Sequence, residues 1–274
     1  MPISLAGGCR VSDMSEGVPV VNGTLRIWNQ VGRATGALSI SLRIIEFAPG
    51  LSPALGNAEC DEILYVLDSV ERRWERGHPV RLSEQRGRTN DVGVSGEILI
   101  NGHPHNISSD TGIYIRPHEI FAVDNPGPDS IVFVSARCPE PDAALEFVAL
   151  STAPASDSPP PLVRLADRKA QPTADRWYRV LVDVEIGSTK ATQFVGSIPP
   201  GRAPDHFHEY EEVLFTLKGE GRMWAGETST EIAPGSCIYL PKGQVHCVEN
   251  TGVEELRLLG VFYPAGSPSV RYDV

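Results

Sequence analysis

Three histidines and one glutamate in the second half of the chain have the types and spacing of a metal site. His206 and His208 stand two residues apart, and residues i and i+2 of a β-strand project from the same face. Glu212 follows His208 by four residues and keeps the same parity, so its carboxylate can point the same way. His246 follows a turn at 241–243 and fits a neighbouring antiparallel strand. We therefore predict that His206, His208, Glu212 and His246 bind one metal ion.

The types of the four ligands limit which metal ions could bind and which reactions these ions could support. Three neutral imidazoles and one carboxylate suit divalent Fe, Mn, Ni, Co or Zn, and ligand type alone does not choose among these ions. An octahedral ion with four protein ligands keeps two positions open for substrate, water or dioxygen. The predicted cofactor is one divalent transition metal ion per chain, able to support oxygen chemistry or Lewis-acid chemistry.

Short β-strands are the elements that must hold these ligands. The chain of 274 residues contains 26 glycines and 23 prolines, and its apolar stretches are short and rich in Val, Ile, Tyr and Phe. Stretches such as 62–67, 131–134 and 212–217 have the length of strands, and no long segment with a helical period competes with them. The sequence predicts an all-β fold.

An internal repeat divides the chain into two halves. Residues 62–67 match 212–217, which lie 150 positions later, and residues 113–125 match 238–250, which lie 125 positions later. The change in offset indicates that residues 71–95 are an insertion in the first half only. A solvated surface loop is the expected structure of this insertion, with a lid or a dimer contact as the alternative.

A proline-rich segment separates the two halves. Residues 151–162 are rich in Ser, Ala and Pro, which favours an extended linker over a paired strand. The predicted domains are therefore an N-terminal barrel at 1–150 and a C-terminal barrel at 163–274.

The second half resembles the cupin family. Both cupin motifs are matched, with one departure: one residue fewer separates Gly201 from His206 than is usual in the family. The resemblance implies two double-stranded β-helix, or jelly-roll, barrels in tandem, which is the arrangement called a bicupin. The matching positions are Gly201, His206, His208, Glu212 and Gly219 in the first motif and Gly235, Pro241, Gly243, His246 and Asn250 in the second.

The first half does not repeat the ligand set. Taken literally, the offsets place Gly56, Ala58 and Phe121 opposite the three histidines, and Glu62 opposite Glu212. One carboxylate alone does not hold a transition metal ion. We therefore predict that the N-terminal barrel is a structural copy that has lost its metal ligands.

Alternation along the strands suggests which side chains share the second barrel with the metal. Gln193, on the strand before the ligands, is the first candidate for a polar contact with a substrate. Arg179, Tyr210 and Trp224 are further candidates. For each of the four, packing in the core is the alternative.

Composition excludes several classes of protein. A formal net charge of −11 and a pI near 5.1 argue against a nucleic-acid binder. No apolar run reaches the roughly 18 residues that span a bilayer, and no signal peptide is visible, so we expect a cytoplasmic protein with no membrane contact. The five cysteines form no C-x-x-C pair and are expected to be reduced thiols. A homodimer is expected because cupin barrels often bury an edge strand against a partner.

The resemblance implies a metal-dependent enzyme that acts on a small organic molecule. A mononuclear iron dioxygenase or other oxygenase is preferred, on family frequency only. The alternatives are a Mn-, Ni- or Zn-dependent hydrolase similar to the ureidoglycine aminohydrolases, an isomerase, or a decarboxylase. A cupin that binds a small molecule without catalysis is a further alternative, against which the complete ligand set argues.

Overall fold

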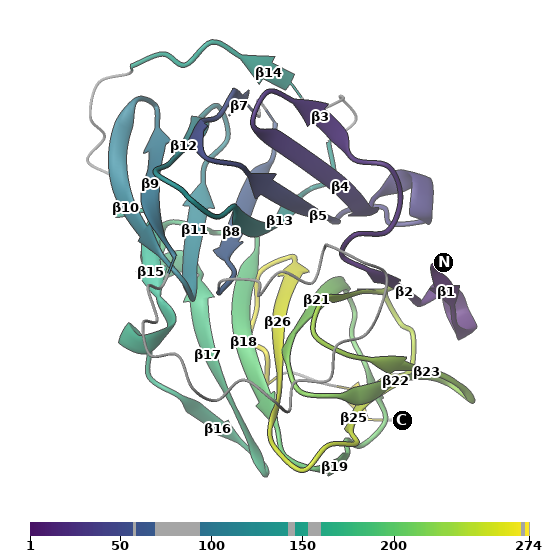
Figure 1. The fold of residues 1–274 in the computed structure, drawn as a ribbon. Helices are drawn as coiled ribbons and strands as arrows, with labels where there is room; N and C mark the ends of the chain where they lie inside the picture. The colour runs from purple at the N-terminus through teal and green to yellow at the C-terminus, as the bar shows by residue number, and fades with distance from the viewer. Residues whose placement is uncertain (57–58, 69–93, 142–145, 153–159, 270–271, 274) are drawn as a thin grey trace.

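The computed structural model describes residues 1–274 except 57–58, 69–93, 142–145, 153–159, 270–271 and 274. The chain forms two β-barrels that lie side by side, the N-terminal one drawn in purple to teal and the C-terminal one in green to yellow (Figure 1). The prediction of an all-β fold with two tandem barrels is confirmed. Residues 71–93 of the predicted insertion lie outside the described residues.

The N-terminal barrel consists of a seven-stranded and a six-stranded antiparallel sheet. The larger sheet has the order β15 (Leu162–Arg164), β11 (Thr111–Ile115), β8 (Asp61–Val66), β13 (Ile131–Cys138), β5 (Ser41–Phe47), β4 (Leu25–Val31), β3 (Val20–Asn22). The smaller sheet has the order β10 (His103–Ser108), β9 (Ser95–Ile100), β12 (Ile120–Asn125), β7 (Ala54–Gly56), β14 (Glu146–Val148), with β6 (Gly50–Leu51) also on β12.

The C-terminal barrel repeats this plan with an eight-stranded and a six-stranded sheet. The larger sheet has the order β1 (Ile3–Ser4), β2 (Arg10–Asp13), β24 (Ser236–Leu240), β21 (Glu211–Lys218), β26 (Leu256–Tyr263), β18 (Thr192–Ile198), β17 (Arg176–Val182), β16 (Gln171–Thr173). The smaller sheet has the order β23 (Thr228–Ile232), β22 (Gly221–Ala225), β25 (His246–Asn250), β20 (His206–Phe207), β27 (Tyr272–Asp273), with β19 (Gly201–Arg202) also on β25. Four short 3-10 helices connect described strands: η1 (Ala6–Gly8), η2 (Arg33–Thr35), η3 (Leu165–Asp167), η4 (Val184–Ile186).

Strand pairing crosses the predicted domain boundary in both directions. Strand β2, at the start of the chain, pairs with β24 of the C-terminal barrel, with Val11 opposite Ile238. Strand β15, which follows the linker, pairs with β11 of the N-terminal barrel, with Ile113 opposite Leu162. Each exchanged strand covers an edge that would otherwise expose unpaired backbone groups. The domain division at 1–150 and 163–274 stays a prediction. In the structure, each half of the chain contributes one strand to a sheet of the other barrel.

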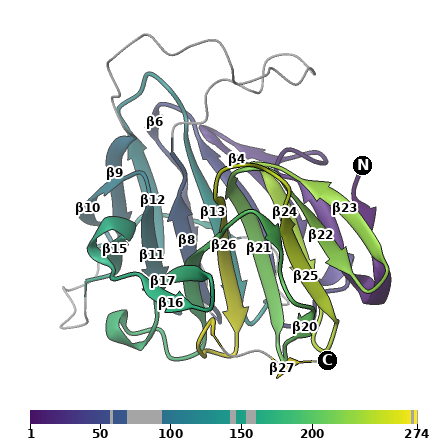
Figure 2. The ribbon, with the colours of Figure 1, turned by 90° about the horizontal axis from the view of Figure 1, so that it is seen from below.

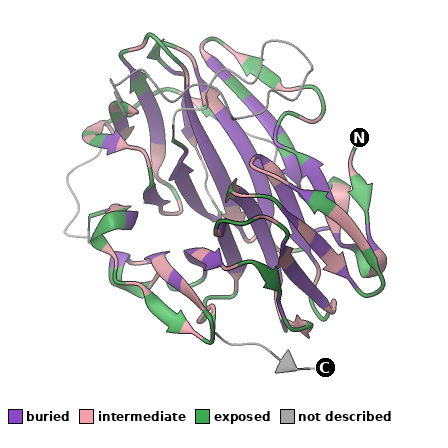
Figure 3. Ribbon diagram, turned by 60° about the horizontal axis from the view of Figure 1, so that its bottom comes forward, coloured by how far each residue is buried: buried purple, intermediate pink, exposed green. Residues whose placement is uncertain are grey.

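The two barrels share one apolar core in addition to an interior of their own. Figure 2 shows β21 and β26 of the C-terminal barrel beside β8 and β13 of the N-terminal barrel. Their facing side chains, among them Tyr65, Val134, Val213 and Val261, belong to a single buried cluster. The buried residues accordingly concentrate in the central strands of both large sheets (Figure 3). Burial of this shared surface joins the halves into one unit.

A polar contact reinforces this shared core. Glu211 on β21 accepts hydrogen bonds from the backbone N–H of Leu38 at 2.9 Å and from that of Ser39 at 2.6 Å. The hydroxyl of Tyr239 donates to the same carboxylate at 2.5 Å. Burial raises the pKa of Glu211, but the hydrogen bonds from Ser39, Tyr239 and Leu38 outweigh burial and hold the pKa below its usual value. The ionised carboxylate therefore ties a loop of the N-terminal barrel to the C-terminal one.

Two further expectations concern thiols and membranes. The five cysteines, Cys9, Cys60, Cys138, Cys237 and Cys247, are buried and form no disulfide bond, as expected of reduced thiols. Within the described ranges, no helix has the length and apolar character needed to cross a bilayer.

Candidate metal centre

Strand pairing brings the predicted ligands together. His206 on β20 lies directly opposite His246 on β25. His208 follows β20 immediately, and Glu212 lies near the start of β21. The backbone N–H of Gly243, in the turn before β25, donates to the carbonyl of His208 at 2.8 Å. The turn is thereby fixed against the segment that carries the other ligands.

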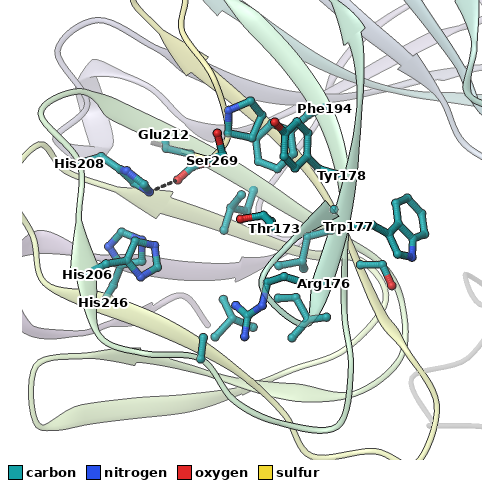
Figure 4. Close-up of a pocket in the computed structure, with 18 residues that line it drawn as sticks. Thr173, Arg176, Trp177, Tyr178, Phe194, His206, His208, Glu212, His246 and Ser269 are labelled. Atoms are coloured by element: carbon teal, nitrogen blue, oxygen red, sulfur yellow. Dashed lines mark ion pairs between the residues drawn. The ribbon is translucent and has the colours of Figure 1, made fainter. Parts of the chain in front are cut away.

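The three histidines form a compact cluster. One ligand atom from each of His206, His208 and His246 lies within 4.8 Å of the others. The ring centroid of His206 is 5.0 Å from that of His208 and 4.5 Å from that of His246. Figure 4 shows the rings of all three directed into one cavity. This arrangement could hold a metal ion.

Backbone carbonyls orient two of the rings. Nδ1 of His206 lies 3.0 Å from the carbonyl oxygen of Pro204, and Nδ1 of His246 lies 2.8 Å from that of Gln244. A carbonyl oxygen can only accept a hydrogen bond, so each Nδ1 carries a proton, and in the neutral ring Nε2 then keeps its lone pair. Histidines that bind metal ions are oriented in this way, with the other ring N–H given to a carbonyl or carboxylate.

Burial shifts the pKa values of two residues of this site, His246 and Glu212. It lowers the pKa of His246 to about 4, with repulsion from His206 as the second cause. An imidazole that is neutral near pH 7 is the form that coordinates cations. Burial also raises the pKa of Glu212 to about 8. Its Oε2 lies 3.5 Å from Nε2 of His208, although Glu212 is not part of the close group formed by the three histidines.

A cavity of about 140 Å³ opens beside the histidines. A cavity of roughly 150 Å³ is enough for a ligand the size of benzene. Most of its wall is apolar or aromatic, and the polar groups stand at a few positions, as in small-molecule sites. The lining residues are Thr173, Arg176, Trp177, Tyr178, Phe194, Gly196, Ser197, Ile198, Ala203, His206, His208, Glu212, Leu214, His246, Val248, Leu258, Pro268 and Ser269.

The four predicted polar contacts lie elsewhere than on this wall. Nε2 of Gln193 donates to the carbonyl of Leu64 at 3.3 Å, across the interface between the barrels. Arg179 donates from Nη1 to the carbonyl of Leu165 at 3.0 Å. Gln193 does not line this cavity, whereas four other residues of β18 do: Ser197, which has the parity of Gln193, and Phe194, Gly196 and Ile198, which have the opposite parity.

The other two candidates have supporting positions. Tyr210 stacks on the ring of His208 with centroids 4.8 Å apart, and so helps to hold this ligand. Trp224 donates from Nε1 to Glu249 at 2.8 Å and lies under the guanidinium of Arg202 at 4.3 Å. Neither residue lines the cavity.

The sequence-based prediction missed the residues of β17 and β18 that do form the wall. Arg176 and Tyr178 share one face of β17, and Phe194 projects from β18. Gly260 leaves room for Phe194, since a Cβ atom there would lie 2.3 Å from Cε1 of the phenyl ring. The alternation of the strands was a usable signal, but the choice between the two parities required the pairing of β18 with β26.

The residues of this site fit a transition metal ion. Three imidazoles with neutral donor atoms and one nearby carboxylate are a suitable borderline donor set. The hydrogen bonds from His206 and His246 to carbonyl oxygens leave Nε2 as the donor atom of both rings. The donor set does not distinguish Fe, Mn, Ni, Co and Zn.

Comparison with known proteins finds relatives of the part of the chain that carries this site. Residues 194–262 match the model described as Cupin domain. Auxin-binding protein 1 from Arabidopsis thaliana is 36% identical over 70 residues, which are 22% of this chain and 35% of that protein. An uncharacterised protein of Streptomyces coelicolor is 37% identical over 60 residues, which are 22% of this chain and 56% of that protein. The chain therefore spans about a third to a half of the length of these relatives.

Solved structures match over nearly the whole chain. A point mutant of Bacillus subtilis oxalate decarboxylase has a TM-score of 0.69 at 13% identity, covering 93% of this chain and 77% of that one. A putative glyoxylate-induced protein from Pseudomonas aeruginosa has a TM-score of 0.68 at 14% identity, covering 96% and 91%. At such identities the likeness concerns the fold. Residues 194–262 thus match a cupin domain, and the fold of the chain is the two-barrel fold of a bicupin.

Proposed function

We propose that the C-terminal barrel is the active site of a metal-dependent bicupin enzyme that acts on a small organic molecule. One observation carries the proposal: the ligand atoms of His206, His208 and His246 lie within 4.8 Å of one another at the wall of a cavity of about 140 Å³. A cluster of metal-binding side chains beside a mostly apolar cavity is the arrangement expected of a catalytic site.

The side chains of this barrel have separate tasks in the proposal. His206 and His246 are held by the carbonyls of Pro204 and Gln244, so they present Nε2 without reorganisation. Glu212 supplies a carboxylate next to His208. A bound ion would act as a Lewis acid or, if it is iron, would support oxygen chemistry.

The apolar part of the wall contributes by excluding water. Leu214, Val248 and Leu258 line the cavity and are largely buried. Displacing water from such a surface strengthens the electrostatic contacts between a bound substrate and the polar groups of the site.

Two reaction classes are consistent with this site. Oxygen-dependent conversion at mononuclear iron is the first, and it rests on the resemblance of the motifs. Metal-dependent decarboxylation is the second, and it is supported by the similarity in fold to oxalate decarboxylase, for which Mn(II) centres are described. The two classes differ in their need for dioxygen.

Metal analysis tests the proposal directly. Protein purified without chelators is expected to contain about one transition metal ion per chain. The double variant His206→Ala/His246→Ala is expected to lose the ion, whereas His103→Ala/His105→Ala, on β10 of the other barrel, is expected to keep it. Stoichiometric metal in the first variant would refute the assignment of the site.

The reaction class is tested with the metal-loaded protein. Oxygen uptake and carbon dioxide release are measured with a panel of catechols, diketones and small carboxylic acids. Turnover that needs air supports the oxygenase, and carbon dioxide release that persists under argon supports the decarboxylase. The absence of turnover in the double histidine variant is the expected control.

A further inference from the structure

Arg176 places a positive charge in the wall of the cavity that contains the histidines. It is the first residue of β17, and its side chain is 19% exposed. Figure 4 shows the guanidinium directed into the same cavity as the rings of His206 and His246. The charge therefore belongs to the site and not to the outer surface of the barrel.

One edge of this guanidinium is held by a neighbour. Nε of Arg176 donates to Oδ1 of Asp175 at 3.0 Å. This contact engages Nε and leaves Nη1 and Nη2 as donors for a ligand in the cavity that Arg176 lines. Two parallel N–H groups on one edge match the two oxygens of a carboxylate.

Another part of the cavity wall suits an apolar body. Tyr178, from the same face of β17, and Phe194 stand on the wall, and the hydroxyl of Tyr178 is directed to Gln171 at 3.0 Å. The ring of Tyr178 therefore offers a face to a ligand, while its polar end is already bonded. Aromatic side chains bury a large area at a small cost in conformational entropy.

We propose that Arg176 determines substrate class by binding the carboxylate of a compact organic acid, whose other end faces the histidines. The inference deepens the proposed function, because it relies on that function for the reacting end of the substrate. A single guanidinium matches a single negative charge, and the cavity of about 140 Å³ limits the apolar body to roughly the size of one ring. Benzoate is accordingly a suitable probe, and benzamide is its neutral counterpart of the same shape.

Calorimetric titration of the full-length protein with the two probes tests the inference. We expect benzoate to bind at least about tenfold more tightly than benzamide, in both metal-loaded and chelator-treated protein, since a charge-assisted double hydrogen bond is lost with the amide. Arg176→Gln is expected to abolish this preference while retaining its metal. Arg222→Gln, which removes an arginine paired with Glu231 outside the cavity, is expected to keep the preference.

A second variant covers the case in which Arg176→Gln fails to fold. Arg176→Lys keeps the charge but not the two-point geometry, and its preference for benzoate is expected to be smaller than that of the unmodified protein. A preference equal to that of the unmodified protein would contradict the two-point contact.

Two outcomes would overturn the inference. One is equal binding of benzoate and benzamide by the unmodified protein. The other is a preference that survives in Arg176→Gln but disappears in His206→Ala/His246→Ala, which would place the carboxylate on the metal ion. In that second case the proposed metal-dependent function would stand while the role of Arg176 would not.

Discussion

The two barrels have the same plan but different interiors. In the C-terminal barrel His206 lies opposite His246. In the N-terminal barrel Leu55 lies opposite Phe121 at the equivalent pair of positions. Both of these residues are buried in the apolar cluster that fills this barrel. Apolar side chains of the N-terminal barrel thus occupy the positions of two histidines that could hold a metal ion in the C-terminal barrel.

The carboxylate common to both barrels shows the difference most clearly. Glu62 and Glu212 occupy equivalent positions on β8 and β21. Glu62 forms a buried ion pair with Arg43 and accepts a hydrogen bond from Ser135 at 2.6 Å. By strand register, Phe194 of the second barrel stands where Arg43 stands in the first. The first barrel thus supplies its own positive charge, and the second has an aromatic wall and a group of histidines that could hold a metal ion.

Removing the internal cation should have the largest effect. Arg43→Met leaves Glu62 buried without its ion-pair partner, and we expect a loss of about 3–5 kcal/mol in the free energy of unfolding. The double variant Arg43→Met/Glu62→Met removes both charges and should recover most of that loss. Urea unfolding followed by fluorescence measures both. A double variant as unstable as the single one would show that the ion pair is not the source of the effect.

The equivalent pair Leu55 and His206 allows a matched test of packing against coordination. Leu55→Ala should cost about 2–5 kcal/mol in stability, because it opens a cavity in a filled core, and should leave the metal content unchanged. His206→Ala should lower metal affinity at least about tenfold. Elemental analysis and urea unfolding of both variants provide the measurements. Loss of metal from a folded Leu55→Ala protein would contradict the distinction between the two interiors.

Glu211 and Asp61, which directly precede Glu212 and Glu62, should also contribute differently to stability. Glu211→Gln replaces an acceptor oxygen with an amide donor against the backbone N–H groups of Leu38 and Ser39, and should cost about 1–3 kcal/mol. Asp61, its equivalent, accepts from the hydroxyl of Tyr114 at 2.7 Å, so Asp61→Asn keeps an acceptor oxygen and should cost less. Thermal unfolding of the two variants compares them, and equal losses would argue against a special role of Glu211 between the barrels.

A smaller difference between the barrels should appear in the dependence of stability on acidic pH. Burial raises the pKa of Glu255, but hydrogen bonds from Ser197 and Arg257 outweigh burial and hold the pKa below its usual value. A folded pKa below the unfolded value of about 4.3 means that this stabilisation is complete above that pH and is lost as the pH falls through the folded pKa. Ser130, a neutral residue, stands at the equivalent place before β13.

The difference in stability between the unmodified protein and Glu255→Gln measures this contribution. It should be present at pH 6 and should shrink between about pH 4 and pH 3. Ser130→Ala is the matched control, in which no such dependence is expected. A difference that stays constant with pH would contradict the assignment.

Much of the ligand set was accessible from the chain alone. His206, His208, Glu212 and His246 were predicted from spacing, and the structure brings the three histidines together. The equivalence of Glu62 and Glu212 follows from an offset of 150 and agrees with strand register. The predicted equivalent of His206 in the first barrel was wrong by one residue. The strand register makes Leu55, and not Gly56, the residue equivalent to His206. Ala58, the predicted equivalent of His208, lies outside the described residues.

Local periodicity was sufficient for the all-β fold, the duplicated halves and the histidine group, because these depend on residues near one another in the chain or on repeated patterns. Tertiary structure decided what surrounds the histidines. Whether Gln193 or Phe194 faces the cavity depends on the pairing of β18 with β26, which lies far away in the sequence. Whether Arg176 reaches the cavity depends in turn on the pairing of β17 with β18. A shift of one residue in that pairing would turn every side chain to the other face. The exchange of β2 and β15 between the barrels was decided in the same way, by the edges that these strands cover.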